Sequence, residues 1–417
     1  MAGLLLTVPD LVALDLPGLA RRAGYPGTRV VPALSWLLSL LALKLTATRR
    51  VSHVDDLLLV DPAAAMFAGL AMLPKKSALT SYSYRTSHDN QRDFLLGLDT
   101  KLVASGLATA EQAIFDLDFH AVMHWGQDPV LEKHYVPTRS QRARSVLTFF
   151  ARDSDTHNLV YANADLSKAT CNREPIAFCD HWKAATGADP HMLVMDQKIT
   201  THTVLGELDA RGVTFLTLRM RSTSLMNYIN TLTPADYKTI TLDRGGKHTK
   251  PKVHESTDIT LTDYPGTVRQ LIVIGLGHDA PTVIITNDHT STVKQLIQRY
   301  ARRMGIEQRL AEIIRAFHAD ALSSTVNLNV DLDITLCVLA HAVLTALGTH
   351  LPGYAAVTPD TLQRRFLDTP GEIITNGHTI TVRLDRRAYS PTLRQSTLPE
   401  ATTVPWLGNR TLRFEYA

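Results

Sequence analysis

The stretch IFDLDFHAV, from Ile114 to Val122, alternates apolar side chains with two acids and a histidine. Such alternation in a segment rich in aromatic and β-branched residues predicts a strand. Residues two apart lie on one face of a strand, so Asp116 and Asp118 project together while the apolar residues fill the other face. Adjacent carboxylates are costly to bury, which leaves two explanations: a solvent-facing edge strand, or acids that bind a cation.

The segments that follow predict a mixed sheet with helices packed on it. LTFFARD and LVYANAD flank the turn-rich SDTHN, and HMLVMD and VTFLTLRMR supply two further strands. Helices are predicted over Arg173–Thr186 and in THTVLGELDARG, which ends at Gly212. The resulting order β-β-β-α-β-α-β is typical of an α/β fold.

The chain divides into five parts that differ in composition and in predicted secondary structure. A helical part comes first, a threonine-rich β insertion interrupts the α/β part, and a long helix from about Thr292 to Ala319 precedes the apolar helix ITLCVLAHAVLTAL and a β-rich tail. The predicted boundaries are 1–110, 111–221, 222–290, 291–350 and 351–417.

Composition excludes several classes of protein. The 417 residues are 45% hydrophobic and 20% charged, as in globular proteins, and a net charge of +3 requires any nucleic-acid affinity to come from local clusters. Three scattered cysteines fit a reducing compartment. The apolar run Pro32–Leu45 contains Lys44 and is too short to span a bilayer. We therefore expect a cytoplasmic protein that does not bind membranes.

Asp196 ends the buried strand HMLVMD, at a point where functional residues often lie in α/β sheets. The next residues, QKITT, begin a helix that Thr200 or Thr201 can cap. Asp196 can therefore be a functional carboxylate or simply the acid of a turn.

The helix QLIQRYARRMGIEQRLAEIIRAF places Tyr300, Arg303 and Glu307 on one face, beside an apolar stripe. The alternative for this set is an exposed Arg303–Glu307 pair, worth a few tenths of a kcal/mol. Gly305, inside the helix, lowers helix stability by about 1 kcal/mol relative to alanine, and close packing against another segment is the explanation we expect for it.

The order of these motifs resembles DDE transposases of the bacterial insertion-sequence type. An Asp on the first strand, an Asp after the fourth, a β-rich insertion and a Tyr-x-x-Arg-x-x-x-Glu helix carry the resemblance, through LDFHAVMHWG, LVMDQKITT and RYARRMGIEQ. It implies an α/β fold with an RNase H-like mixed sheet, flanking helices and a β-rich insertion. It also implies a helical, DNA-binding amino-terminal domain.

The resemblance implies that Asp118, Asp196 and Glu307 are the catalytic, metal-binding acids, with Tyr300 and Arg303 in support. Asp116, which shares a strand face with Asp118, would be a possible supporting residue or a misassigned neighbour. The acids would hold two Mg²⁺ ions about 3.5–4 Å apart, for which Mn²⁺ can substitute. One ion would activate a water or 3′-hydroxyl, and the other would stabilise the leaving oxygen.

The activity so implied is cleavage at transposon ends, followed by transfer of the 3′-hydroxyl into target DNA. The implied partners are double-stranded DNA, as terminal repeats and target, and a second copy of the chain in a homodimer on DNA. The expected location is the cytoplasm, in association with the nucleoid. Two alternatives stay open: an RNase H-like nuclease without strand transfer, and a domesticated, non-catalytic DNA-binding protein.

Cationic side chains near the motifs are candidate phosphate contacts, with a solvated surface as the alternative. The family often has a Lys seven positions after the Glu, where this chain has Ile314, so either Arg309 or Arg315 could replace it. The other candidates lie in the predicted loop PTRSQRARS between the first two strands, after Asp196 and in KHTKPK: Arg139, Arg142, Arg144, Lys198, Lys250 and Lys252.

Overall fold

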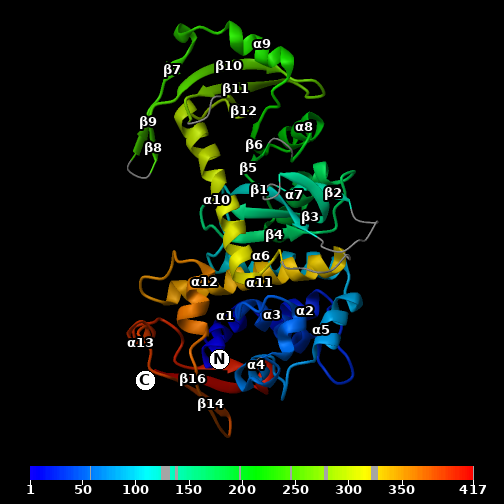
Figure 1. Cartoon of the computed structure of the whole chain (residues 1–417), viewed down its shortest axis with the longest axis vertical. Helices are drawn as coiled ribbons and strands as arrows, with labels where there is room; N and C mark the ends of the chain where they lie inside the picture. The colour runs from blue at the N-terminus through cyan, green and yellow to red at the C-terminus, as the bar shows by residue number, and fades with distance from the viewer. Residues whose placement is uncertain are drawn as a thin grey trace.

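The computed structural model describes residues 1–56, 58–123, 132–136, 140–196, 199–244, 247–276, 280–320 and 327–416. Figure 1 shows an elongated molecule with three tiers along its long axis. The core strands occupy the middle tier, the insertion lies above it, and the amino-terminal helices lie below it with the carboxy-terminal sheet.

A mixed sheet forms the middle of the molecule, with β1 at its centre. β1 is antiparallel to β3 on one side and parallel to β5 on the other, and β5 is parallel to β6. The predicted α/β class, a mixed sheet with flanking helices, is confirmed. The core strands are β1 (Ile114–Met123), β2 (Lys133–Val136), β3 (Gln141–Asp153), β4 (Leu159–Asn163), β5 (Met192–Met195) and β6 (Thr214–Leu218).

One of the two explanations for the acids of β1 fails, and one prediction about the connection from β1 to β3 is wrong. β1 is an interior strand, so the edge-strand explanation for its acids fails. Part of the predicted loop PTRSQRARS is also strand, because Gln141–Arg144 pair with β2 and extend β3 beyond the end of β1. Pairing with β2 satisfies the backbone of this polar segment, which local apolar periodicity does not indicate.

Helices cover both faces of the sheet. α7 (Glu174–Thr186) packs on one face, where Phe115 meets Phe178 and Trp182 with ring centroids 5.0 and 4.5 Å apart. α10 (Val293–Phe317) crosses the opposite face, to which the acids of β1 project. α8 (His202–Ala210) begins at Thr201, whose hydroxyl accepts from the Val204 amide at 3.4 Å.

The β-rich insertion widens the core sheet. β12 is antiparallel to β6, and β11 and β10 follow outward, giving a sheet of ten strands among the described residues. An α-helix also lies among the described residues of the insertion. Its elements are α9 (Thr223–Thr231), β7 (Lys238–Thr239), β8 (Leu242–Arg244), β9 (Lys247–Thr249), β10 (Lys252–Thr260), β11 (Thr267–Ile274) and β12 (Thr282–Thr286).

The amino-terminal helices and the carboxy-terminal tail pack together around α11, within one buried core. The predicted division into domains stays a prediction. The helices are α1 (Val8–Ala13), α2 (Leu16–Arg22), α3 (Ala33–Leu45), α4 (Pro62–Phe67), α5 (Lys76–Tyr82), α6 (His88–Ala104), α11 (Asn327–His350), α12 (Pro359–Leu362) and α13 (Ser390–Arg394). The tail strands are β13 (Gly371–Asn376), β14 (Thr379–Leu384), β15 (Thr402–Val404) and β16 (Arg410–Tyr416).

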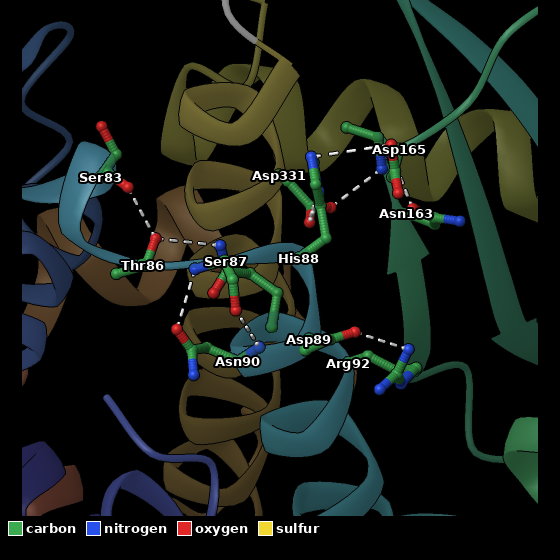
Figure 2. A network of polar contacts seen from close by, with 12 residues as sticks. Ser83, Thr86, Ser87, His88, Asp89, Asn90, Arg92, Asn163, Asp165 and Asp331 are labelled. Carbon is green, nitrogen blue, oxygen red and sulfur yellow. Dashed lines mark hydrogen bonds and ion pairs between the residues drawn. The ribbon is translucent and has the colours of Figure 1, made fainter. Parts of the chain in front are cut away.

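Polar contacts tie the amino-terminal helices to the core, as Figure 2 shows around His88. His88 Nδ1 lies 2.6 Å from Asp331 Oδ2 on α11, and the other Asp331 oxygen accepts from the Ala164 amide after β4 at 2.9 Å. The hydrogen bond to Asp331 raises the pKa of His88. One buried carboxylate therefore joins α6, α11 and the end of β4.

The apolar sequence of α11 has a structural explanation. Leu328–His350 is long and apolar enough to cross a membrane, but 94% of its most apolar window is buried inside the protein, as in the core helix of a soluble protein. α11 contacts β4, α3 and α6. In the described part of the chain, Ala2–Ala13 and Leu16–Arg22 are together also long and apolar enough to cross a membrane, although the two helices are bent by 61° relative to each other.

Candidate functional site

Two of the predicted acids lie on neighbouring strands at the centre of the sheet. Leu117 pairs in register with Met195 across the parallel strands β1 and β5. An acid follows each member of this pair: Asp118 follows Leu117 in β1, and Asp196 follows Met195 directly after β5. Parallel register therefore sets Asp118 and Asp196 side by side.

α10 brings the third acid and a cation to the same place. Arg303 Nη1 lies 4.0 Å from Asp118 Oδ1, and Arg303 Nη2 donates to Glu307 Oε1 at 3.1 Å. The Arg303 guanidinium also lies 5.6 Å from the centre of the Tyr300 ring. The predicted pair at i, i+4 is present, but it is not a surface pair, because Arg303 is only 6% exposed while Glu307 keeps 55% of its side chain exposed.

Arg303 has unused hydrogen-bonding capacity. Its Nε and Nη1 atoms are buried and have no hydrogen-bond partner among the described residues. A guanidinium presents its donors in a planar fork that suits phosphate oxygens. Arg303 can therefore hold a ligand oxygen while it keeps its hydrogen bond to Glu307.

The charges at the site interact strongly. The pKa of Asp118 is raised to about 6, chiefly by burial; Arg303 lowers it, and the neighbouring Glu307 and Asp196 raise it. Burial also raises the pKa of Tyr300 to about 12, so its phenol stays protonated at neutral pH. The acids repel one another, which is the electrostatic condition that a bound cation relieves.

We expect Asp118→Asn to stabilise the metal-free protein at neutral pH. The folded-state pKa of Asp118, about 6, lies above the ordinary 3.8, so folding binds a proton and wild-type stability falls as pH rises from about 4 to 6. Asparagine removes this loss of stability, which amounts to about 3 kcal/mol at pH 7 and to almost nothing near pH 3. Urea unfolding of the wild type and of Asp118→Asn at pH 7 and at pH 3, in EDTA, measures this difference in stability. An equal difference at the two pH values would contradict the raised pKa of Asp118.

The residue types fit a hard divalent cation. In the described part of the chain no three metal-ligating side chains lie close enough to hold an ion as they stand. The Arg303 guanidinium, between Asp118 and Glu307, supplies the compensating positive charge. Carboxylate oxygens on rigid elements are nevertheless the ligands that Mg²⁺ prefers.

Asp116 has a different environment from Asp118. It is 0% exposed, and its Oδ2 accepts from Arg152 Nη1 at 2.7 Å. The two residues lie opposite each other on β1 and β3. Asp116 is therefore held in an internal ion pair with Arg152.

The cationic candidates are dispersed. Strand alternation from Arg152 sets Arg144 and Arg142 on the α10 face of the sheet, beyond the end of β1. Lys250 and Lys252 are exposed at the start of β10 in the upper tier. Arg139 and Lys198 lie outside the described residues.

Arg309 and Arg315 differ as replacements for the missing lysine. Arg309 pairs with Glu312 and projects about 160° around the helix from Glu307. Arg315 is exposed and projects about 80° from Glu307. The geometry favours Arg315 for a contact on the Glu307 side.

Arg152 was missed by the reasoning from sequence. A signal was present, because LTFFARD sets an arginine within an otherwise apolar strand, where a charge needs a partner. The partner lies on another strand, so the segment alone does not identify it.

Neither a scan against protein-family models nor a search of curated proteins finds a match for this chain. Inference about its activity therefore rests on its own residues.

Proposed function

We propose that this chain is a DNA transposase of the DDE type, with Asp118, Asp196 and Glu307 as its metal-binding acids. The observation that carries the proposal is the buried Arg303, which lies 4.0 Å from Asp118 of β1, donates to Glu307 of α10 and interacts electrostatically with Asp196 at the end of β5. An ordinary surface helix would pair Arg303 with Glu307 alone. The presence of Asp118 and Asp196 near the same arginine favours a functional site, since clustered charges of this kind gather at catalytic and binding sites.

The strand order supports an RNase H-like core as the framework. β4, β3 and β1 are antiparallel neighbours, and β5 and β6 continue the sheet parallel to β1. The first strand is therefore central and carries Asp118 in its middle. We propose that the insertion β7–β12 is a lateral extension of this core sheet.

The residues have distinct tasks in the proposed reaction. Asp118 projects from β1, Asp196 follows the neighbouring strand β5, and Glu307 projects from the facing helix. Together the three acids would hold Mg²⁺, or Mn²⁺ in its place. When bound, two such ions polarise the attacking oxygen and stabilise the leaving one. The buried Nε and Nη1 of Arg303 would donate to a phosphate oxygen. Tyr300, protonated at neutral pH, would donate a hydrogen bond beside it.

The proposed steps are displacements at phosphorus. In the first, a water oxygen bonds to phosphorus and loses a proton to solvent, the bond from phosphorus to the 3′ oxygen breaks, and that oxygen takes up a proton to become a 3′-hydroxyl. In the second, the freed 3′-hydroxyl attacks a phosphate of target DNA in the same way. We propose that two copies of the chain act together on the terminal repeats and the target.

The direct test is cleavage of a plasmid that carries this gene with its flanking DNA. We expect purified chain to cut at the gene's flanks in Mg²⁺ or Mn²⁺ and not in EDTA. It should also join a pre-cut flanking end to a second plasmid. Absence of cutting in both metals would overturn the proposal. Cutting without joining would favour the nuclease alternative.

A further inference from the structure

We propose that Arg152, Asp116 and Gly305 form a clamp that sets the position of α10 against β1, with Arg152 as a positioning residue for the acids. The inference rests on the proposed function of the site, which it deepens. We call these three residues the Arg152 clamp.

The sheet holds the Arg152 guanidinium from two sides. Nη1 donates to Asp116 Oδ2 at 2.7 Å, and Nη2 contacts the His157 ring in the turn between β3 and β4. Arg152 and Asp116 are both buried. A buried ion pair persists only with good geometry and further hydrogen bonds, so the guanidinium has a defined place.

α10 lies directly on this guanidinium at Gly305. A Cβ at residue 305 would lie 2.7 Å from Arg152 Nη1 and 3.1 Å from Cζ and Nη2. The first distance is shorter than any normal contact, so a side chain there would displace the helix or the arginine. This close approach explains why a helix-weakening glycine stands inside α10.

The clamp is adjacent to the site residues on both elements. Asp118 follows Asp116 by two positions on β1, and Gly305 stands midway between Arg303 and Glu307 on α10. The clamp therefore determines how far Glu307 and Arg303 stand from Asp118. A misplacement of about 1 Å can cost on the order of 10²-fold in rate, so exact seating of α10 should matter for cleavage.

The first experiment is a double-variant cycle with cleavage of the gene-bearing plasmid as readout. We expect Gly305→Ala to retain DNA binding, to need more Mn²⁺ for half-maximal cleavage, and to cut on the order of 10²-fold more slowly. In an Arg152→Met background the same change should have little further effect, because the clashing group is gone. Strictly additive losses would overturn the clamp.

The second experiment does not depend on cleavage and so separates the clamp from the proposed function. Amide hydrogen exchange over residues 303–307 should quicken in Gly305→Ala and in Arg152→Lys, which lacks the planar fork. Arg211→Lys is the matched control, since Arg211, at the end of α8, is paired with Asp180 of α7 and with Asp189, away from the clamp residues in sequence. Unchanged exchange in both clamp variants would overturn the clamp even if the wild type cuts DNA. Quickened exchange in the clamp variants, together with no cutting of DNA by the wild type, would keep the clamp and reject the transposase.

Discussion

Asp118→Asn is expected to lower the rate of metal-dependent DNA cleavage by at least 10²–10³-fold, the order of magnitude for loss of a group that acts directly on developing charge. The carboxylate lies beside Asp196 and 4.0 Å from Arg303, at the centre of the proposed site. Asparagine keeps the shape but halves the oxygen donors and removes the charge that a divalent ion needs. The measurement is the single-turnover rate on the gene-bearing plasmid in Mg²⁺ and in Mn²⁺.

Binding of DNA by the same variant should be unchanged or slightly tighter, because a negative charge near the phosphates is lost. Asp385→Asn, an exposed change after β14, is the matched control and should cut at the wild-type rate. Wild-type cleavage by Asp118→Asn would remove Asp118 from the mechanism. Together with the expected gain in metal-free stability, the result would mark a carboxylate retained for activity at a cost in stability.

Asp116→Ala is expected to lower the free energy of unfolding by about 3–5 kcal/mol, because it leaves the Arg152 charge buried and unpaired. The contrast with Asp118 is sharp, since the two acids share one strand face only two residues apart. Urea unfolding followed by circular dichroism measures the loss. The reference variant Glu372→Ala breaks an exposed pair with Arg383 and should cost less than about 1 kcal/mol.

Replacing both partners tests the cause of this loss. A double change, Asp116→Leu with Arg152→Met, removes the buried charges together and should recover much of the stability lost in Asp116→Ala. Equal destabilisation in the single and double variants would show that packing, and not the unpaired charge, explains the effect. The Arg152 clamp further predicts that the double variant cleaves DNA poorly despite its recovered stability.

Much of the local structure could be predicted from the sequence. The period-two patterns of β1, β3 and β4, the run MLVM of β5 and the helical repeat around Arg303 each depend on residues close in the chain. The same patterns place Asp118 on a strand face, Asp196 at a strand end and Glu307 beside Arg303. The local side-chain chemistry was likewise sufficient to nominate a carboxylate site.

Pairings between distant segments could not be predicted in this way. β12 joins β6 and turns the insertion into an extension of the core sheet, and Gln141–Arg144 become strand by pairing with β2. Backbone hydrogen bonds of a sheet are made with another segment, so a strand's own residues do not specify its neighbour.

The sequence by itself determined which residues are acidic, which faces they take and that Gly305 weakens a helix. Only the tertiary structure decided that Asp116 and Asp118 have different partners and that Gly305 admits the Arg152 guanidinium. The physical reason is separation along the chain. Arg152 meets a helix about 150 residues later, where space at residue 305 depends on how the whole sheet and α10 pack together.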